Sequence, residues 1–342
     1  MRVRILREVG GIGDLVRCTA VATAIKKQYP SAYIEMWTIA KYAPYARQCP
    51  DISKVVVLSE PVRERDSDWR KVYSPEGFDH TIDLYCPAFR YERAVAPFVD
   101  KDRIEIWTES AAEQSGLDLK PCKPVVSLSR ECLRGGKVVA RRCGFGYKGE
   151  REVPVVGMLT SNASGLRSFG GKQFVGIAKR LHEAGCRVFG IDQRYTPEEL
   201  WGLVDQLDLL VCTDTGPMHM AGALDIPCVV VCSTTEGSLL TKWYDSVRYI
   251  NVAFCEPATC AGHCYYASRR EHLHWCLKNN QCDALKHFSP TLVAKAALEV
   301  LGGGGCEAED NQPAHEASRN SKRTVSEDEV VGLVPLSQAG GV

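Results

Sequence analysis

Short apolar runs alternate with longer amphipathic stretches along most of the 342-residue chain. Runs of this length, rich in Val, Ile and Leu, are typical of buried strands, and the stretches between them have helical periodicity. Short strands that alternate with helices indicate doubly wound parallel sheets, so we predict an α/β fold. Strands are predicted at Val3–Leu6, Tyr33–Trp37, Lys54–Leu58, His80–Leu84, Arg103–Trp107, Val153–Leu159, Cys186–Ile191 and Leu207–Cys212, and in the apolar run that ends at Cys232.

The helical stretches carry recognisable ends. Thr196 and Glu199 have the spacing of a capping box, and Gly185 follows a helix where a C-terminal glycine is expected. Ser289 and Pro290 have the pattern of a cap and a first helical residue. Helices are therefore predicted at Leu15–Tyr29, Lys172–Ala184, Pro197–Gln206, Met218–Leu224 and Ser289–Leu301.

The periodic pattern stops in two places. Between Pro121 and Pro154 the sequence is basic and contains glycines, which is typical of a region that joins two domains. We therefore predict domains at 1–150 and 151–302. Residues 303–342 are polar and aperiodic and are predicted to be disordered, although the run from Glu329 to Val334 could instead be a peptide-docking motif.

Composition narrows the class of protein. The chain is 45% hydrophobic and 25% charged, as soluble globular proteins are, and Lys+Arg and Asp+Glu number 42 each. Because the charges balance, the chain as a whole has no net electrostatic attraction for nucleic acid or membranes. No apolar run reaches the roughly 18 residues of a membrane span, and the N-terminus has the pattern of a strand rather than of a signal peptide. We expect a cytoplasmic protein whose 16 cysteines are thiols or metal ligands.

The stretch from Leu207 to Cys232 contains the clearest candidate site. A strand, the loop Thr213–Gly216 and a helix follow one another, with Thr215 or Gly216 as N-cap and Pro217 just inside the helix. The free N–H groups of such a helix bind anions such as phosphate. An ordinary capped helix is the alternative, but it does not require Asp214 and His219 beside the same terminus.

Two further loops follow predicted strands. Glycines 10, 11 and 13 precede a helix, but their spacing is not that of a dinucleotide fingerprint. Asp14, next to them, is either the N-cap of that helix or a catalytic carboxylate at the mouth of the sheet. The loop 160–171 contains Ser164 and Arg167 and is either a second phosphate-binding loop or a solvated one.

Four segments together resemble the heptosyltransferase family, glycosyltransferase family 9. They are GGIGDLVRCTAVATAIKKQYP at 10–30, FDHTIDL at 78–84, SNASGLRSFGGKQF at 161–174 and DTGPMHMAGALDIPCVVV at 214–231. The resemblance implies the GT-B fold, two Rossmann-like domains that face each other across a cleft. It also implies that Asp14 is the general base and that the donor-binding residues are Gly11, Gly13, Ser164, Arg167, Asp214, Thr215, Gly216, His219 and Thr234.

The implied activity is an inverting, metal-independent transfer of a heptose or related sugar from a nucleotide sugar, ADP- or UDP-linked, to an acceptor hydroxyl. No cofactor is implied beyond that donor. The acceptor is expected to be a glycan or lipid-linked. Two alternatives stay open: the same chemistry on a nucleic acid base or other glycan, or a non-catalytic nucleotide-sugar-binding protein. A polyanionic acceptor would bind the basic residues of the joining region. These residues could instead form a solvated face. They are Arg134, Lys137, Arg141, Arg142 and Lys148.

A cysteine-rich segment spans 255–282. Its spacings are not the C-x₂-C pairs of common zinc modules, so two interpretations remain, a structural zinc site or thiols and a disulfide. The candidate ligands are Cys255, Cys260, Cys264, Cys276 and Cys282.

Overall fold

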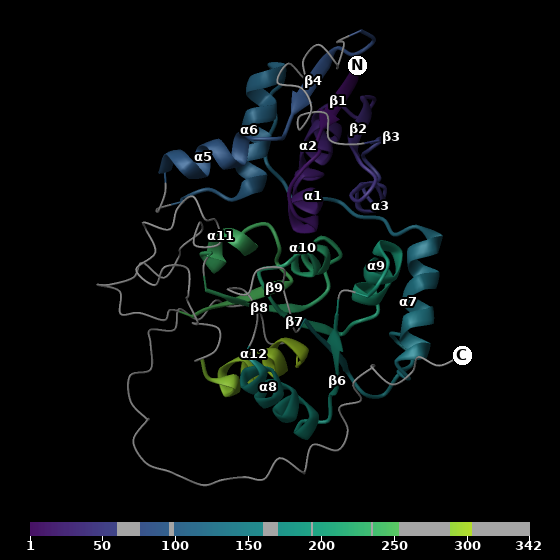
Figure 1. Ribbon diagram of the computed structural model, residues 1–342, viewed down its shortest axis with the longest axis vertical. Coiled ribbons are helices and arrows are strands. Elements are labelled where there is room, and N and C mark those ends of the chain that lie inside the picture. The colour runs from purple at the N-terminus through teal and green to yellow at the C-terminus, as the bar shows by residue number, and fades with distance from the viewer. Residues whose placement is uncertain are drawn as a thin grey trace.

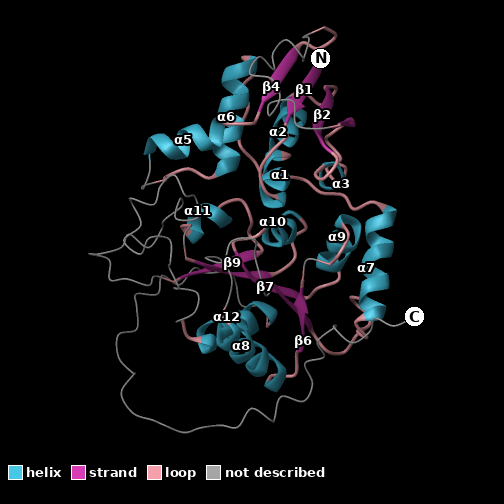
Figure 2. Ribbon diagram, in the orientation of Figure 1, coloured by secondary structure: helices cyan, strands magenta, loops and turns pink. Residues whose placement is uncertain are grey.

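The computed structural model of the chain describes residues 1–59, 76–95, 99–159, 170–192, 194–233, 235–252 and 288–302. Helices and strands alternate along these residues, and the strands form two separate parallel sheets (Figures 1 and 2). The predicted α/β class is therefore confirmed. None of the described helices combines the length and the apolar character that a membrane crossing requires.

The first sheet contains four strands in the order β3-β2-β1-β4, and all its pairs are parallel. Val3 in the central strand pairs with Ile34 on one side and His80 on the other. Its strands are β1 (Arg2–Leu6), β2 (Tyr33–Ile39), β3 (Lys54–Leu58) and β4 (His80–Asp83). Its helices are α1 (Ile12–Cys18), α2 (Ala20–Gln28), α3 (Ala43–Ala46), α5 (Pro87–Val95) and α6 (Arg103–Ser115).

The second sheet contains five parallel strands in the order β6-β5-β7-β8-β9. Three of them, β5, β7 and β8, are buried at every position, which explains why they have continuous apolar runs. The strands are β5 (Val155–Leu159), β6 (Arg187–Ile191), β7 (Leu209–Thr213), β8 (Cys228–Cys232) and β9 (Val247–Asn251). The helices are α7 (Arg130–Arg142), α8 (Gly171–Glu183), α9 (Pro197–Asp205), α10 (Gly216–Ala223), α11 (Gly237–Thr241) and α12 (Pro290–Leu301).

Two apolar clusters stabilise this arrangement. The smaller cluster lies between the second sheet and the helices α8 and α12, which cover one of its faces (Figure 2). The larger one includes side chains from the first sheet, α1, α10, α9 and the opposite face of the second sheet. Because this cluster is continuous across α1 and α10, the two sheets belong to one packed body.

One predicted segment was wrong, and another contains a helix that was not predicted. Arg103–Trp107 was predicted as a strand but begins α6, where the Asp102 carboxylate accepts the N–H of Ile104 at 2.7 Å and Glu105 accepts the N–H of Asp102 at 3.0 Å. This is a capping box, and it overrides the strand-like alternation of the next residues. The joining region also contains a regular helix, α7, which packs against α9. The domain boundaries themselves stay a prediction.

Candidate functional site

Asp14 lies in the first turn of α1, immediately after the loop that follows β1. Gly11 is the N-cap of this helix, and Asp14 stands three residues later, where its carboxylate accepts the N–H of Gly11 at 3.1 Å. The expectation that Asp14 is itself the N-cap is therefore wrong. An acid in the first turn still stabilises the helix, because its charge faces the positive end of the helix dipole.

Three arginines surround the Asp14 carboxylate, and they define what we call the arginine cluster: Arg7, Arg17 and Arg103. Arg17 donates to Oδ1 of Asp14 at 3.1 Å, Arg103 donates to the same oxygen, and a nitrogen of Arg7 lies 3.8 Å from Oδ2. All three side chains are buried or nearly so. Both oxygens of Asp14 therefore face cations.

A second layer of acceptors fixes these arginines. Asp102 accepts a hydrogen bond from Arg17 at 3.0 Å, and Glu92 accepts hydrogen bonds from two nitrogens of Arg103. The guanidinium groups of Arg7 and Arg17 also lie over the ring of Trp107, at 4.8 and 5.9 Å from its centroid. Each cation thus has a partner on both sides, which holds the cluster in a single arrangement.

Burial and charge act in opposite directions on Asp14. Burial alone would raise the pKa of its carboxyl, but the charges of Arg103, Arg17 and Arg7, together with the Gly11 N–H, lower that pKa well below its usual value. The carboxylate therefore stays deprotonated throughout the neutral range.

The second part of the site is the start of α10, directly after β7. Of the two predicted candidates, Thr215 is its N-cap, with an extended backbone, and Pro217 follows in the first turn. The hydroxyl of Thr215 is buried and has no hydrogen-bond partner within the described part of the chain. A buried hydroxyl without a partner is costly, so a ligand oxygen is a suitable partner for it.

Asp214 and His219 lie beside this helix terminus. Thr235 donates to Oδ2 of Asp214 at 3.1 Å, and Nε2 of His219 is 3.9 Å from Oδ1. His219 is 1% exposed, and its Nδ1 has no hydrogen-bond partner among the described residues. Burial, and then the charge of Arg17, lower the pKa of His219 well below its usual value, despite the opposite effect of Asp214. The imidazole is therefore neutral and can both donate and accept a hydrogen bond.

The first turns of α1 and α10 pack directly against each other (Figure 1). A Cβ on Gly13 would lie 2.5 Å from Cδ2 of His219, and one on Gly216 would lie 3.1 Å from Cβ of Ile12. Only glycines permit an approach this close. The structure therefore brings Asp14 and the Asp214–His219 loop to one place, although they are 200 residues apart in the sequence.

The structure does not describe every predicted site residue. Ser164, Arg167 and Thr234 lie outside the described residues, as do the five cysteines of the segment 255–282. Within the described part of the chain, no three His, Cys, Asp or Glu side chains are grouped as a metal site would require.

Sequence reasoning missed the arginine cluster and its acceptors. Arg17 had a local signal, because it stands three residues after Asp14 on the same helix. Arg103 and Asp102 also had a local signal in the sequence, the capping box at the start of α6. It was not recognised because that segment was predicted to be a strand. Arg7 and Glu92 reach the site only through the tertiary fold.

Comparison with known proteins gives a consistent result. Residues 177–263 match the family model described as glycosyltransferase family 9 (heptosyltransferase). No curated protein matches the chain. Several solved structures are similar to this chain. Their sequence identities to it are low, so the similarity is one of fold.

Three of these structures illustrate the likeness. A glycosyl transferase family 9 protein from Veillonella parvula has a TM-score of 0.68 and 14% identity, over 88% of this chain and 97% of its own. The E. coli ADP-heptose LPS heptosyltransferase II has a TM-score of 0.62 and 15% identity, over 89% and 99%. The iron-containing dodecameric glycosyltransferase TibC, from enterotoxigenic E. coli, has a TM-score of 0.53 and 14% identity, over 88% and 78%.

The two parallel sheets are those of the GT-B heptosyltransferases. The chain is thus similar to the family 9 heptosyltransferases in fold and, over residues 177–263, in sequence.

Proposed function

We propose that the chain transfers a heptose or related sugar from a nucleotide-sugar donor to an acceptor hydroxyl, with inversion and without a metal ion. The observation that carries this proposal is the contact between α1 and α10, which brings the Asp14 carboxylate to the anion-binding end of a helix. Inverting transfer needs these two elements together, a base for the incoming hydroxyl and stabilisation for the departing diphosphate.

The start of α10 suits the diphosphate. Its free N–H groups and the positive end of its dipole attract phosphate oxygens. The Thr215 hydroxyl and Nδ1 of the neutral His219 are buried polar groups with unused hydrogen-bonding capacity. The proposed donor site consists of Gly11, Gly13, Ser164, Arg167, Asp214, Thr215, Gly216, His219 and Thr234, of which Ser164, Arg167 and Thr234 lie outside the described residues.

Asp14 is the proposed general base. A carboxylate of lowered pKa is a weak base, but the hydroxyl becomes strongly acidic once its oxygen bonds to the anomeric carbon. Asp14 then accepts the hydroxyl proton, while the bond from the anomeric carbon to the diphosphate oxygen breaks and its electron pair leaves with the diphosphate. The arginine cluster keeps the base ionised and in position.

The donor is proposed to be ADP-linked, with UDP-linked sugars as the alternative. Support comes from the names of two neighbours: one is an ADP-heptose transferase, and TibC has been solved with ADP-D-β-D-heptose. The acceptor is proposed to be a glycan or lipid-linked hydroxyl. The basic residues that suggested a nucleic acid acceptor belong to α7 and the residues after it, and α7 is separated from the α1–α10 contact by α9 (Figure 1).

A panel of ADP- and UDP-linked sugars tests this proposal. We expect one ADP-linked sugar to raise the melting temperature, because a ligand that binds only the folded state stabilises it, and to release ADP when acceptor is present. Dialysis against EDTA with metal analysis of the protein tests metal independence, which is a pertinent question because TibC contains iron. The proposal is wrong if no nucleotide sugar stabilises the protein, and its mechanism is wrong if transfer requires added metal.

A further inference from the structure

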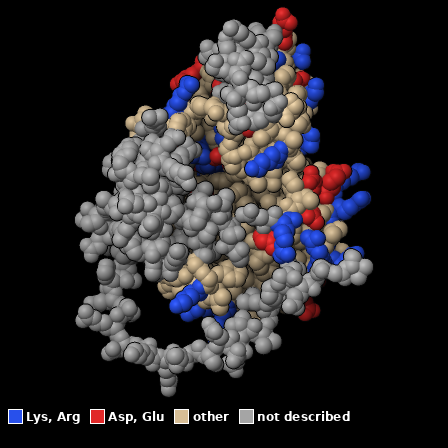
Figure 3. All heavy atoms as spheres, viewed as in Figure 1, with Lys and Arg blue, Asp and Glu red and all other residues tan. Residues whose placement is uncertain are grey.

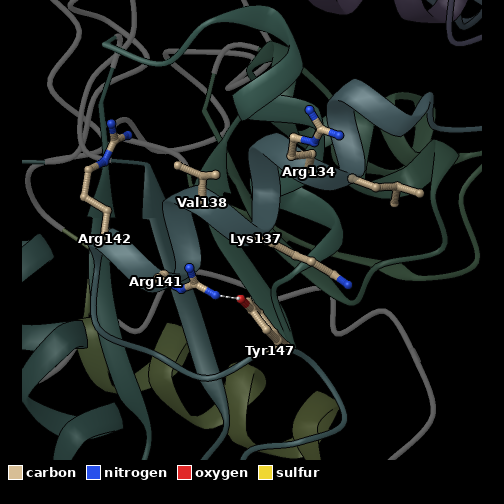
Figure 4. A pocket seen from close by; sticks show the side chains of 7 residues that line it. Arg134, Lys137, Val138, Arg141, Arg142 and Tyr147 are labelled. Carbon is tan, nitrogen blue, oxygen red and sulfur yellow. Dashed lines mark hydrogen bonds between the residues drawn. The ribbon is translucent and has the colours of Figure 1, made fainter.

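The outward face of α7 carries a hollow with an apolar floor and a basic rim. Leu133 and Val138 are exposed there, at 42% and 52%, and the hollow between the helix and Tyr147 has a volume of about 640 Å³. The cations around it are Arg134, Lys137, Arg141 and Arg142 (Figure 4). We call this region the α7 surface. Lys and Arg side chains lie along the edge of the molecule where α7 lies, with Asp and Glu side chains among them (Figure 3).

Part of this charge is not neutralised locally, although the charge of Arg134 interacts with that of Glu131. Within the described residues, Arg134, Lys137 and Arg141 form no ion pair with a carboxylate, whereas Arg142 lies 3.6 Å from Glu199. Lys137 lies over the ring of Tyr147 at 5.3 Å, and Arg141 donates to its hydroxyl at 2.8 Å. Residues 130–151 contain seven basic and two acidic side chains in a chain whose formal charge is zero, so the matching acidic residues lie elsewhere in the sequence.

The α7 surface is not part of the proposed transfer site. The inner face of α7 packs on α9, and α9 in turn packs on α10. A Cβ on Gly136 would lie 2.2 Å from the carbonyl oxygen of Gly202, so the two helices are in backbone contact and leave no passage between them. The charge on the outer face is therefore not used by the proposed transfer site.

One segment of the same chain has the complementary pattern. Residues 326–336 read SEDEVVGLVPL, three consecutive acids followed by aliphatic residues, and they belong to the part of the chain outside the described residues. We propose that this segment docks on the α7 surface, with its acids on Arg134, Lys137 and Arg141 and its aliphatic residues over Leu133 and Val138. Charge complementarity steers such contacts, and apolar burial supplies most of their affinity.

The length of chain between the two partners permits this contact. The last described helix, α12, ends at Leu301, and residues 303–325 connect it to the acidic run. An extended chain of that length spans up to roughly 75 Å, whereas a folded body of about 300 residues has a radius of gyration of roughly 20 Å. A tether also raises the effective concentration of the segment to about the millimolar range, so even a weak contact is occupied.

Hydrogen exchange on the full chain tests this proposal. We expect the amides of 329–336 to exchange at least about tenfold more slowly than in a free peptide of the same sequence, and to lose this protection in an R134Q/K137Q/R141Q variant. The matched control is K172Q/K179Q/R180Q, which removes the same charge from exposed positions of α8 and should leave the protection intact. Protection should weaken at high salt, because exposed charges are screened.

Three results would overturn the proposal. Exchange of 329–336 at the free-peptide rate in the unmodified chain excludes docking, and protection that survives the α7 substitutions places the segment elsewhere. Protection that increases with protein concentration assigns the contact to a second copy of the chain.

A separate assay with phosphatidylglycerol vesicles tests the competing occupant: if the α7 substitutions abolish vesicle binding and do not affect the exchange of 329–336, the surface binds a membrane instead.

Discussion

Asp14 obtains its three arginines from three separate segments: the loop after β1, α1 itself and the start of α6. The sequence could predict the carboxylate, because it follows a strand and three glycines at the mouth of a parallel sheet. It could not predict the cluster, because a pattern along the chain does not show which cations the fold brings to an acid. The same holds for the burial of His219, which depends on its contact with Gly13 across the two sheets.

The Asp14→Asn substitution tests the role of the carboxylate. Asn keeps the shape and the acceptor for the Gly11 N–H but cannot take a proton, so we expect kcat to fall by about 10² to 10⁴. Donor affinity should change by less than about threefold, since the proposed diphosphate site is on α10. Turnover with isothermal titration of the donor measures both. Asp118→Asn, at an exposed position, is the control, and an equal loss of donor affinity and turnover would refute the assignment.

His219 predicts a pH dependence of stability. Its pKa in the folded protein lies well below the value of about 6.5 in the unfolded chain, so below pH 6.5 the unfolded state binds a proton that the folded state does not. Stability from this residue is thus complete above pH 6.5 and declines as the pH falls, by up to about 2 kcal/mol at pH 5.

Urea unfolding between pH 5 and 7 measures this effect. The His219→Gln variant should lose the decline over that range, whatever its stability at pH 7, because Gln does not titrate. His182→Gln, on the exposed face of α8, should keep it. An unchanged slope in the His219 variant would show that the imidazole is not buried in its neutral form.

The elements differ in how well their patterns predict them. Three strands of the second sheet, β5, β7 and β8, are buried at every position and have apolar runs. Both bounds of β5 and β7 were predicted within two residues, and β8 ends at Cys232 as predicted. The α7 helix was missed because Gly135 and Gly136 suggested a loop, whereas the glycines serve its packing against α9. The predicted helix Leu15–Tyr29 is two helices, α1 and α2, which meet at Thr19. β9 has no counterpart among the predictions.

The crossing of α7 and α9 gives a stability prediction. A Cβ on Gly136 would meet three backbone atoms of Gly202 between 2.2 and 2.8 Å, and backbone cannot move aside as a side chain does. We therefore expect Gly136→Ala to destabilise the protein by about 3 kcal/mol, despite the better helix propensity of Ala. Gly171→Ala, which has nothing within 4 Å of its Cβ, should be neutral or stabilising. Thermal unfolding of the two variants compares them, and equal melting temperatures would show that the helices are farther apart.

At the scale of the whole molecule, the two sheets meet through α1 and α10 and through charged side chains around that contact. Lys242 lies 2.7 Å from Glu105 of α6, and Lys123 pairs with Asp225. These ion pairs are partly exposed, so each contributes at most about 1 kcal/mol. The α1–α10 contact is buried and apolar around its glycines, and it therefore determines the relative position of the two parts of the site.

Gly13→Ala tests whether that position matters for transfer. The added methyl group would lie 2.5 Å from the His219 ring, which is itself packed 5.8 Å from the ring of Tyr244 and cannot retreat. The two halves must therefore separate slightly, and a shift of the reacting groups by about 1 Å costs on the order of a hundredfold in rate. We expect kcat/KM to fall by that factor while the far-ultraviolet circular dichroism stays unchanged, because the helices and strands of both sheets are retained. Gly171→Ala serves again as the control. Activity close to that of the unmodified chain would mean that transfer takes place in another relative arrangement of the two sheets, in which α1 and α10 are apart.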